Sequence, residues 1–395
     1  MTLRPDGPIV IAAGGTGGHL FPGQALAQEL RRRGRKIVLI TDERVQRFDT
    51  LFPGADIFSV PSATPNDRGI SGLAKAAPAI LSGVAQAFGI LGRVQPSAVI
   101  GFGGYPTLPP IAAAIMRRIP TCVHEQNAVL GRVNRLVAPY VHGIASTFAG
   151  PKFLRPRDAD KIVVTGNPVR DAVMAHAAAP YAAPGAGDRI NLLVFGGSQG
   201  ARVMSDVVPG ALSRLPEALR FRLNVVQQAR PEDIDRVRGL YEDAGISAEL
   251  QSFFDDMPVR IAAAHLVIGR SGASTVAELS VIGRPSILVP LPHSLDNDQK
   301  ANAEKLEAAG AGFMIEQKNF SEDALSKRLV ALLADAALLG SAAKAALAQG
   351  APNAVRRLAD LVEMLGRGEF QAEAMKRIAD SRGPSGPLLF ARGGC

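Results

Sequence analysis

Two glycine-rich segments have residue types and spacing suited to binding an anion. Residues 14–19 read Gly-Gly-Thr-Gly-Gly-His and follow a short apolar run. Residues 196–200 read Gly-Gly-Ser-Gln-Gly and follow a similar run. In both places a strand pattern, a glycine turn and a helical pattern come in succession, which directs backbone N–H groups and a helix N-terminus at one point. Each segment therefore predicts a site for a phosphate or a related anion.

Two polar segments also follow predicted strands. Residues 124–127 read His-Glu-Gln-Asn, and residues 271–278 supply a polar loop, a helix start and the carboxylate of Glu278. Open α/β sheets bind ligands at the carboxyl ends of their strands. Residues 124–127 are thus either ligand-facing, which we favour, or a hydrogen-bonded loop with no role in chemistry. Glu278 either accepts hydrogen bonds from a sugar diol or supports the first turn of its helix.

Other chemistries fit the sequence less well. Leu20 stands where the dinucleotide fingerprint G-x-G-x-x-G needs its last glycine, and no P-loop motif occurs. Residues 196–200 match the G-x-S-x-G nucleophile elbow of α/β-hydrolases. A hydrolase, however, has no reason to repeat that element as a glycine loop in its other half. Three D-x-D patterns occur, but they are common by chance, and the six histidines lack paired zinc spacing, so we expect no metal.

The composition favours a cytoplasmic protein with anionic ligands. The 395 residues carry a net charge of +8, 47% of them are hydrophobic, and only two are cysteines. A basic balance favours nucleic acid, an anionic membrane surface or a phosphorylated ligand. Nucleic acid is the weakest of these, because the main basic run, residues 31–36, has no interleaved aromatic residues. Residues 76–92 are nearly uncharged but rich in alanine and glycine, which favours an interfacial helix over a membrane span.

The order of the elements predicts an α/β protein with two similar halves. Strand patterns alternate with helical patterns throughout, which is typical of parallel sheets covered by helices on both faces. Residues 99–104 and 267–272 also correspond to each other, like the two glycine segments. We expect an N-terminal domain at residues 1–165, a linker at 166–189 and a C-terminal domain at 190–350. A final helix at 351–370 and a flexible tail at 371–395 would follow.

An ordered set of motifs resembles the MurG-type peptidoglycan N-acetylglucosaminyltransferases of glycosyltransferase family 28. The motifs are residues 14–19, 103–105, 124–127, 166–170, 196–202, 271–275 and 290–293, followed by Gln299 and Asn302. The resemblance covers roughly residues 8–365. Two segments of the first half depart from the family pattern: Thr107-Leu108-Pro109 replaces a usual Gly-Pro, and residues 41–44 lack a usual Gly-Thr. The acceptor side therefore matches less closely than the donor side.

The resemblance implies a fold and an activity. The fold is GT-B, in which two Rossmann-like domains with parallel sheets face a central cleft. The activity is inverting transfer of GlcNAc from UDP-GlcNAc to the C4 hydroxyl of MurNAc in undecaprenyl-pyrophosphoryl-MurNAc-pentapeptide, with no cofactor. The N-terminal domain would take the lipid-linked acceptor at an anionic membrane surface, on the cytoplasmic face of the bacterial inner membrane, and the C-terminal domain would bind UDP-GlcNAc. No nucleic acid partner is expected.

The resemblance also assigns site residues. Those implied to bind substrate are Thr16, Gly17, Gly18, Asn127, Arg170, Ser198, Phe254, Ala273, Ser274, Thr275, Glu278 and Gln299. Phe254 would contact uracil through its backbone, Glu278 would bind the ribose, and Arg170 would approach the diphosphate or the sugar. Inversion in one displacement requires a base for the acceptor hydroxyl. His19 is the first candidate and Glu125 the second.

A membrane patch is expected in the first domain. The apolar residues 73, 80, 81, 84, 88 and 91 fall near one helical face, with basic residues nearby. The patch is assigned to Leu73, Lys75, Ile80, Phe88, Arg117 and Arg118. Such residues would sit shallowly in the bilayer interface. The alternative is that the apolar side chains belong to the domain core and that the arginines are solvated.

Two other functions fit the same motifs. One is a UDP-sugar:diacylglycerol glycosyltransferase, which would share the donor loops and differ in its acceptor pocket. The other is a sugar-nucleotide-binding protein without turnover. Polar residues in both predicted halves of the site argue against the second.

Overall fold

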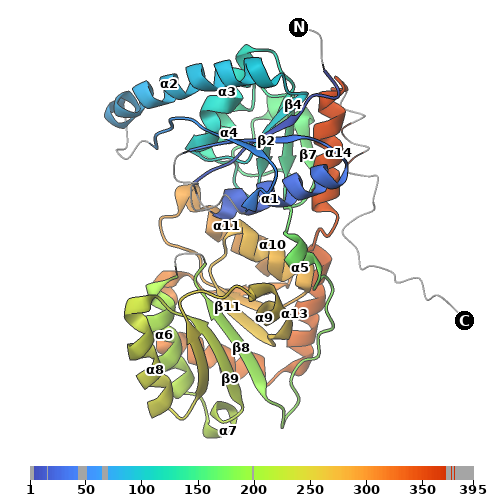
Figure 1. Cartoon of the computed structure of the whole chain (residues 1–395). Helices are drawn as coiled ribbons and strands as arrows, with labels where there is room; N and C mark the ends of the chain where they lie inside the picture. Colours follow the sequence, from blue (N-terminus) through green and yellow to red (C-terminus); the bar gives the residue numbers. More distant parts are fainter. Residues whose placement is uncertain are drawn as a thin grey trace, which may run out of the picture. The chain divides into compact units, whose positions relative to one another are not determined.

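The computed structural model describes most of the chain as two compact units. The described residues are 4–15, 17–42, 51–64, 70–197, 200–370, Met375 and Ile378, with the backbone alone for 70–74. The first unit comprises the described residues up to Arg170 and those from Pro352 onward. The second unit is Asp171–Ala351 (Figure 1). The division after Arg170 falls inside the predicted linker.

The first unit is built on a seven-stranded parallel sheet with the order β3-β2-β1-β4-β5-β6-β7. Its strands are β1 (Ile9–Ala12), β2 (Ile37–Thr41), β3 (Asp56–Ser59), β4 (Ala98–Gly101), β5 (Thr121–Glu125), β6 (Gly143–Ser146) and β7 (Ile162–Val164). Parallel strands covered on both faces need apolar or small residues at successive positions. Accordingly β1, β4 and β6 are buried along their whole length.

Helices cover both faces of this sheet. They are α1 (Gly17–Arg32), α2 (Ile70–Val94), α3 (Leu108–Met116), α4 (Arg132–Val137) and α14 (Ala354–Gly366), with 3-10 turns η3 (Tyr105–Thr107) and η4 (Pro156–Lys161). Ile9 and Ile11 of β1 join one core cluster with residues of α1 and α14. Val10 points the other way, into a cluster with residues of α2 and α3. Side chains that alternate along β1 therefore contribute to two separate cores, one on each face of the sheet.

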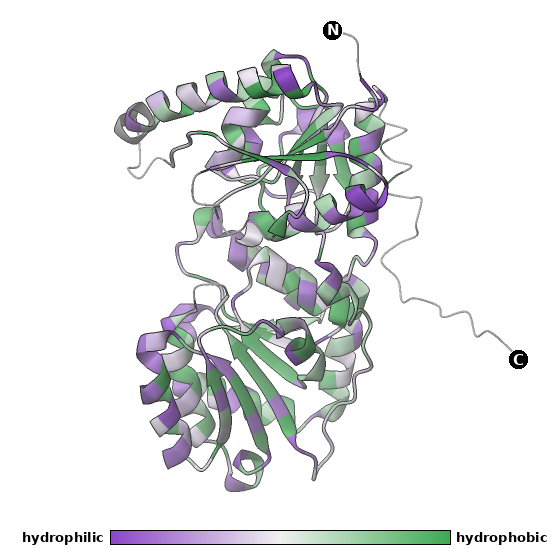
Figure 2. Cartoon of the chain, in the orientation of Figure 1, coloured by the Kyte–Doolittle hydropathy of each residue, from purple (hydrophilic) through white to green (hydrophobic). Residues whose placement is uncertain are grey.

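The second unit repeats the plan with a six-stranded parallel sheet of order β10-β9-β8-β11-β12-β13. Its strands are β8 (Ile190–Phe195), β9 (Leu223–Gln228), β10 (Ser247–Gln251), β11 (Leu266–Gly269), β12 (Ser286–Leu288) and β13 (Gly312–Met314). Its helices are α5 (Asp171–Met174), α6 (Arg202–Ser213), α7 (Glu217–Arg220), α8 (Ile234–Asp243), α9 (Met257–Ala263), α10 (Ala273–Ile282), α11 (Asp298–Ala308), α12 (Glu322–Leu333) and α13 (Ala336–Gln349), with 3-10 turns η5 (Pro231–Asp233), η6 (Leu295–Asn297) and η7 (Gln317–Asn319). Hydrophobic residues concentrate in the strands of both sheets (Figure 2).

Candidate active site

The first glycine segment forms a tight turn between β1 and α1. Gly15 has φ +84°, which L-residues with a side chain rarely adopt. A Cβ on Gly14 would lie 2.8 Å from the Cβ of Pro106, so only glycine fits there. The N-terminus of α1 follows this turn directly, and its N–H groups favour an anion. Thr16, one of the predicted binding residues, lies outside the described residues.

His19 lies against a second glycine turn. The neighbouring strands β1 and β4 end side by side, with Ala12 opposite Gly101. After β4, Gly103 and Gly104 have φ +85° and +74°. A Cβ on Gly104 would lie 3.3 Å from Nε2 of His19. The sheet thus brings the imidazole of His19, at the start of α1, against the turn that follows β4.

Glu125 is a hub of hydrogen bonds at the end of β5. One carboxylate oxygen accepts bonds from the backbone N–H of Gly131 (2.7 Å) and from Nδ2 of Asn134 (2.9 Å). The other accepts bonds from the backbone N–H (3.0 Å) and Nδ2 (3.3 Å) of Asn127. Burial raises the pKa of Glu125, and these donors partly oppose that shift. Both oxygens therefore hold the loop that connects β5 to α4, and Asn127, a predicted binding residue, is part of that loop.

His124 is fully buried and neutral. Its Nε2 makes a 3.0 Å hydrogen bond with the carbonyl oxygen of Gly166, which fixes Nε2 as the protonated nitrogen. Burial is the main cause that lowers the pKa of His124 to about 4; the bond to Gly166 opposes this shift and the nearby His19 adds to it. Its ring packs against Phe102 with the ring centroids 5.5 Å apart. His124 thus joins β5 to the loop after β7 and carries no positive charge at neutral pH.

Arg170 lies beside the first glycine turn. Its guanidinium stacks on the ring of Phe21 at 4.3 Å from the centroid. A Cβ on Gly17 would lie 3.0 Å from that same ring. Arg170 therefore adds positive charge next to the N-terminus of α1. Its contact with a diphosphate stays a prediction. Phe21, which holds Arg170 in this position, was not identified from the sequence, because an aromatic residue inside a helical pattern predicts only core packing.

The second unit presents three neighbouring loops at one edge of its sheet. β8, β11 and β12 are adjacent, so the loops that follow them meet at the carboxyl edge. The first is the glycine segment 196–200, where a Cβ on Gly196 would lie 2.3 Å from the backbone nitrogen of Ala201. Gly197 has φ +88°. Ser198, another predicted binding residue, lies outside the described residues.

Hydrogen bonds join the other two loops. The Ser271 hydroxyl donates to the carbonyl oxygen of Gln299 (2.8 Å), and Nδ2 of Asn302 donates to the carbonyl oxygen of Ser271 (3.1 Å). The backbone N–H of Leu291 donates to Oε1 of Gln299 (3.0 Å), so Gln299 keeps its amide NH₂ as a donor. Gln299 is thereby held next to the loop that begins α10.

The predicted residues of α10 form its first turns. Ala273, Ser274 and Thr275 are half-buried, and Glu278 is buried with 8% of its surface exposed. Because α10 begins at Ala273, the three residues contribute N–H groups that point out of the helix end. Glu278 lies a turn later on the same helix.

Phe254 uses its ring for packing. The residue is 3% exposed, and the guanidinium of Arg260 covers the ring at 4.2 Å from its centroid. Arg260 is itself held by Glu249 and Asp256. The ring is therefore closed to a ligand, and the contact of the Phe254 backbone with uracil stays a prediction.

The predicted membrane residues divide between core and surface. Leu91 of α2 is fully buried, whereas Phe88 is 37% and Leu81 68% exposed. The guanidinium of Arg117 stacks on Phe88 at 3.9 Å from the ring centroid, and its Nε donates to the Phe88 carbonyl oxygen (2.6 Å). Ile80 is half-buried, Lys75 and Arg118 are exposed, and the side chain of Leu73 lies outside the described residues. Phe88 and Arg117 thus form one composite surface of α2 and α3.

One helical stretch in the described chain, Lys75–Val94 of α2, is long and apolar enough to span a membrane, and 22% of its apolar window is buried. A bent pair, Glu322–Leu333 with Ala336–Gly366, passes the same test only if it is counted as one span. α2 packs against α3, and Ala87, Ile90 and Leu91 of α2 enter a core cluster of the first unit. The apolar character of α2 therefore serves the core of the first unit as well as its surface.

Two parallel-sheet α/β units, each with a glycine loop after its first strand, define a protein of the GT-B class. The N-terminal domain model of glycosyltransferase family 28 matches residues 9–146, and its C-terminal domain model matches residues 191–358. The chain belongs to glycosyltransferase family 28. It is therefore a hexosyltransferase.

Relatives and a solved structure agree with this assignment. A protein of Rhodopseudomonas palustris (strain ATCC BAA-98 / CGA009) is 52% identical over 358 residues, which cover 90% of this chain and 98% of that protein. One of Methylobacterium sp. (strain 4-46) is 53% identical over 357 residues, covering 90% and 95%. Both are named UDP-N-acetylglucosamine--N-acetylmuramyl-(pentapeptide) pyrophosphoryl-undecaprenol N-acetylglucosamine transferase. The crystal structure of Acinetobacter baumannii MurG superposes with a TM-score of 0.72 at 27% identity, covering 90% of this chain and 99% of that one.

Proposed function

We propose that this protein transfers GlcNAc from UDP-GlcNAc to the C4 hydroxyl of MurNAc in undecaprenyl-pyrophosphoryl-MurNAc-pentapeptide, with inversion at the anomeric carbon. The observation that carries the proposal is the match to named transferases. The match covers 90% of this chain and at least 95% of each of those proteins. A diacylglycerol acceptor is not favoured by these relatives. The reaction is the conversion of lipid I to lipid II in peptidoglycan synthesis. It serves cell wall growth and cell division.

In the second unit, the three adjacent loops form the donor site of this proposal. UDP leaves as a diphosphate, so negative charge grows on it in the transition state. The N-terminus of α10, with Ala273, Ser274 and Thr275, would face that charge, and a helix N-terminus contributes ~0.3–1 kcal/mol when exposed and up to ~2 when partly buried. Glu278 would accept hydrogen bonds from the ribose, and Gln299 would donate its amide NH₂.

In the first unit, we propose that His19 is the general base. Its imidazole lies at the carboxyl edge of the sheet, against the turn after β4. Glu125 is the weaker candidate, because both of its oxygens already accept hydrogen bonds that hold residues 127–134. We assign Glu125 to positioning Asn127. Gly17, Gly18 and Asn127 would line the acceptor side, and Arg170 would pair with a diphosphate.

The acceptor is anchored in a bilayer, so the first unit must reach the membrane surface. The exposed ring of Phe88, the 65% exposed Met116 and the neighbouring Arg117 and Arg118 support a shallow peripheral contact. Each basic residue near an anionic leaflet contributes about 1 kcal/mol. We propose peripheral binding to the cytoplasmic face of the inner membrane.

A turnover assay tests the function directly. Purified protein is incubated with UDP-GlcNAc and a short-chain analogue of the lipid-linked acceptor, and the disaccharide product and UDP are measured. A diacylglycerol acceptor and buffer alone are run in parallel. Transfer to the muramoyl acceptor is expected. Transfer to diacylglycerol alone, or binding of UDP-GlcNAc without any product, would contradict the proposal.

A further inference from the structure

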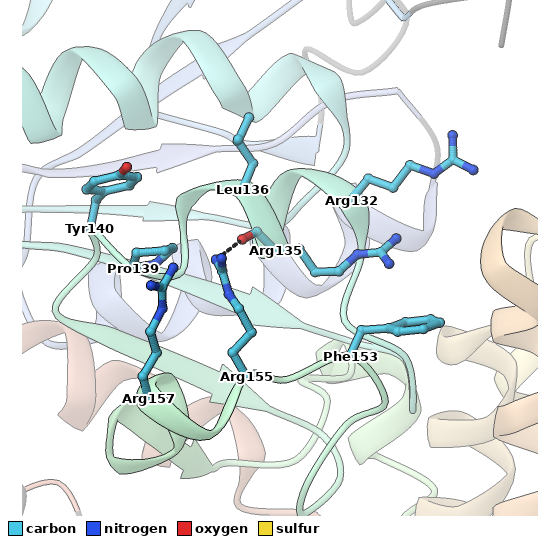
Figure 3. Close-up of a pocket in the computed structure, with 8 residues that line it drawn as sticks. All are labelled: Arg132, Arg135, Leu136, Pro139, Tyr140, Phe153, Arg155 and Arg157. Atoms are coloured by element: carbon cyan, nitrogen blue, oxygen red, sulfur yellow. Dashed lines mark hydrogen bonds between the residues drawn. The ribbon is translucent and has the colours of Figure 1, made fainter. Parts of the chain in front are cut away.

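An arginine-rich pocket opens on the first unit, apart from the residues discussed above. We call it the arginine pocket and define it by Arg132, Arg135, Arg155, Arg157, Tyr140 and Phe153 (Figure 3). Its volume is about 560 Å³. In the described part of the chain, no acidic side chain lines it. The pocket therefore combines concentrated positive charge with exposed aromatic surface, which favours an anionic organic ligand.

Packing and hydrogen bonds hold two of its arginines, Arg135 and Arg155, in place. The guanidinium of Arg135 stacks on the ring of Phe153 at 4.6 Å from the centroid, and Arg155 donates to the carbonyl oxygen of Arg135 (2.8 Å). Arg155 is also paired with the buried Asp158 (3.3 Å). Figure 3 shows the guanidinium groups of Arg132 and Arg135 extending to the same side of the pocket as the Phe153 ring. Arginines fixed in this way present a planar fork to a ligand at a lower entropic cost than mobile lysines.

Phe153 is held in an unfavourable conformation. Its φ is +67°, in the left-handed region that aromatic residues rarely adopt, and 55% of the residue is exposed. Such strain persists only where the surroundings enforce it, and it occurs often at binding sites. Here the enforcing contacts are backbone bonds from Lys152 to Ala128 (2.9 Å) and from Leu130 to Lys152 (2.9 Å).

The same contacts connect the pocket to the acceptor side of the site. Residues 128–130 belong to the loop that Glu125 organises, and the Gly131 N–H donates to Glu125. Arg132 follows Gly131 directly, and the N–H of Arg135 donates to the Gly131 carbonyl oxygen (2.8 Å). The loop held by Glu125 thus leads straight into the arginine pocket.

We propose that the arginine pocket binds the peptide of the acceptor through its carboxylate groups, an inference that rests on the proposed function. The peptide is attached to the same muramoyl sugar that carries the reacting hydroxyl, so its site must lie beside the acceptor site. A peptide ends in a carboxylate, which arginine binds in bidentate geometry. The exposed rings of Phe153 and Tyr140 offer flat apolar surface for the peptide backbone and its small side chains.

A comparison of two acceptors tests the proposal. One short-chain acceptor carries the whole pentapeptide and the other carries the muramoyl sugar without the peptide. The double variant Arg132→Gln/Arg135→Gln is compared with Arg135→Lys, which keeps the charge, and with Arg238→Gln, an exposed arginine of the second unit that serves as the control. KM for each acceptor, kcat and KM for UDP-GlcNAc are measured, and flotation on anionic vesicles is measured for every variant.

We expect the double variant to raise KM about tenfold for the peptide-bearing acceptor only. The kcat and KM for UDP-GlcNAc should stay unchanged, Arg135→Lys should have a smaller effect, and Arg238→Gln none. An equal rise for both acceptors, or no rise for either, overturns the proposal. So does an unchanged KM together with weaker flotation on anionic vesicles, because that result assigns the pocket to lipid headgroups. If the wild type uses neither acceptor, the proposed function itself fails, and this inference fails with it.

Discussion

Individual side chains divide the work of the candidate site into chemistry and positioning. His19 presents its imidazole at the carboxyl edge of the first sheet, while the oxygens of Glu125 are committed to the loop before α4. Asn134 shares that task, since its Nδ2 donates both to Glu125 (2.9 Å) and to the carbonyl oxygen of His124 (3.2 Å). The sequence motif at 124–127 does not include Asn134. This residue lies on the following helix, α4, and only the fold places it next to Glu125.

His19→Ala should lower kcat by ~10²–10⁴-fold, the usual contribution of a general base. UDP-GlcNAc affinity should remain near the wild-type value, because the donor loops belong to the second unit. Steady-state kinetics and calorimetry measure the two quantities separately. A normal kcat for His19→Ala would rule out His19 as the base.

Glu125→Ala should lower kcat and also the denaturation midpoint, because it removes the acceptor of four hydrogen bonds.

Glu278→Ala should weaken UDP binding by roughly tenfold or more, because hydrogen bonds to a charged group are worth ~1.5–3 kcal/mol. Calorimetric titration with UDP gives the affinity. Glu242→Ala, a charge removal at the end of α8, is a control that should leave it unchanged. If UDP binds the Glu278→Ala variant as tightly as the wild type, Glu278 supports only its own helix.

His124 should make stability depend on pH. Its pKa is about 4 in the folded protein and 6.5 when unfolded, so between these values the unfolded chain binds more protons and stability falls as the pH falls. The loss from pH 7 to pH 4 should reach roughly 3 kcal/mol for this group. His124→Gln keeps an N–H donor for Gly166 and removes the titration. Urea midpoints at several pH values should therefore decline less steeply in this variant, and parallel pH curves would show that His124 does not titrate as described.

At the scale of elements, α14 is the segment that returns to the first unit. It packs against α1, and Leu358 and Leu365 enter the core cluster that includes Ile9 and Ile11. Arg33 fastens the two helices, because it binds Asp360 (2.7 Å) and Glu363 (2.9 Å) on α14 as well as Glu29 on α1. The C-terminal helix is therefore a structural part of the first unit, although it follows the second along the chain.

Arg33→Ala should lower the free energy of unfolding by about 1–2 kcal/mol, because the half-buried guanidinium bonds to three carboxylates. Arg32→Ala is the matched control, since Arg32 is 51% exposed and pairs with Glu29 on its own helix. Chemical denaturation with both variants measures the difference. Equal losses in the two variants would mean that the contact to α14 adds nothing.

At the scale of the whole molecule, each sheet gathers its loops at one edge, and we propose that the apolar and basic surface around Phe88 and Arg117 meets the bilayer. Binding to anionic vesicles should fall when Arg117 and Arg118 become Glu, and wild-type binding should fall as salt rises. UDP affinity should be preserved. Flotation measures vesicle binding, with Arg238→Glu as the control for charge reversal. Flotation of the Arg117→Glu/Arg118→Glu protein at the wild-type level would place the membrane contact elsewhere.

The sequence alone determined the two α/β units and the glycine turns after their first strands. Both follow from local causes: apolar runs form buried parallel strands, and glycines at 14–15 and 196–197 permit turns that no other residue fits. The order of the motifs also identified the family. The backbone contact of Phe254 with uracil stays a prediction, and the structure adds that its ring packs beneath Arg260.

Only the tertiary structure decided which distant residues share a surface. The stacking of Arg170 on Phe21 and the return of α14 to the first unit join residues far apart in sequence. The bond of Asn134 to Glu125 joins a helix to the strand before it, across nine residues. The arginine pocket likewise needs α4 and the loop after β6 to meet. Periodicity reports which face of an element is apolar, but not which partner that face will meet. Those partners are fixed only when helices and sheets pack into a core, because the packing between elements selects which side chains meet.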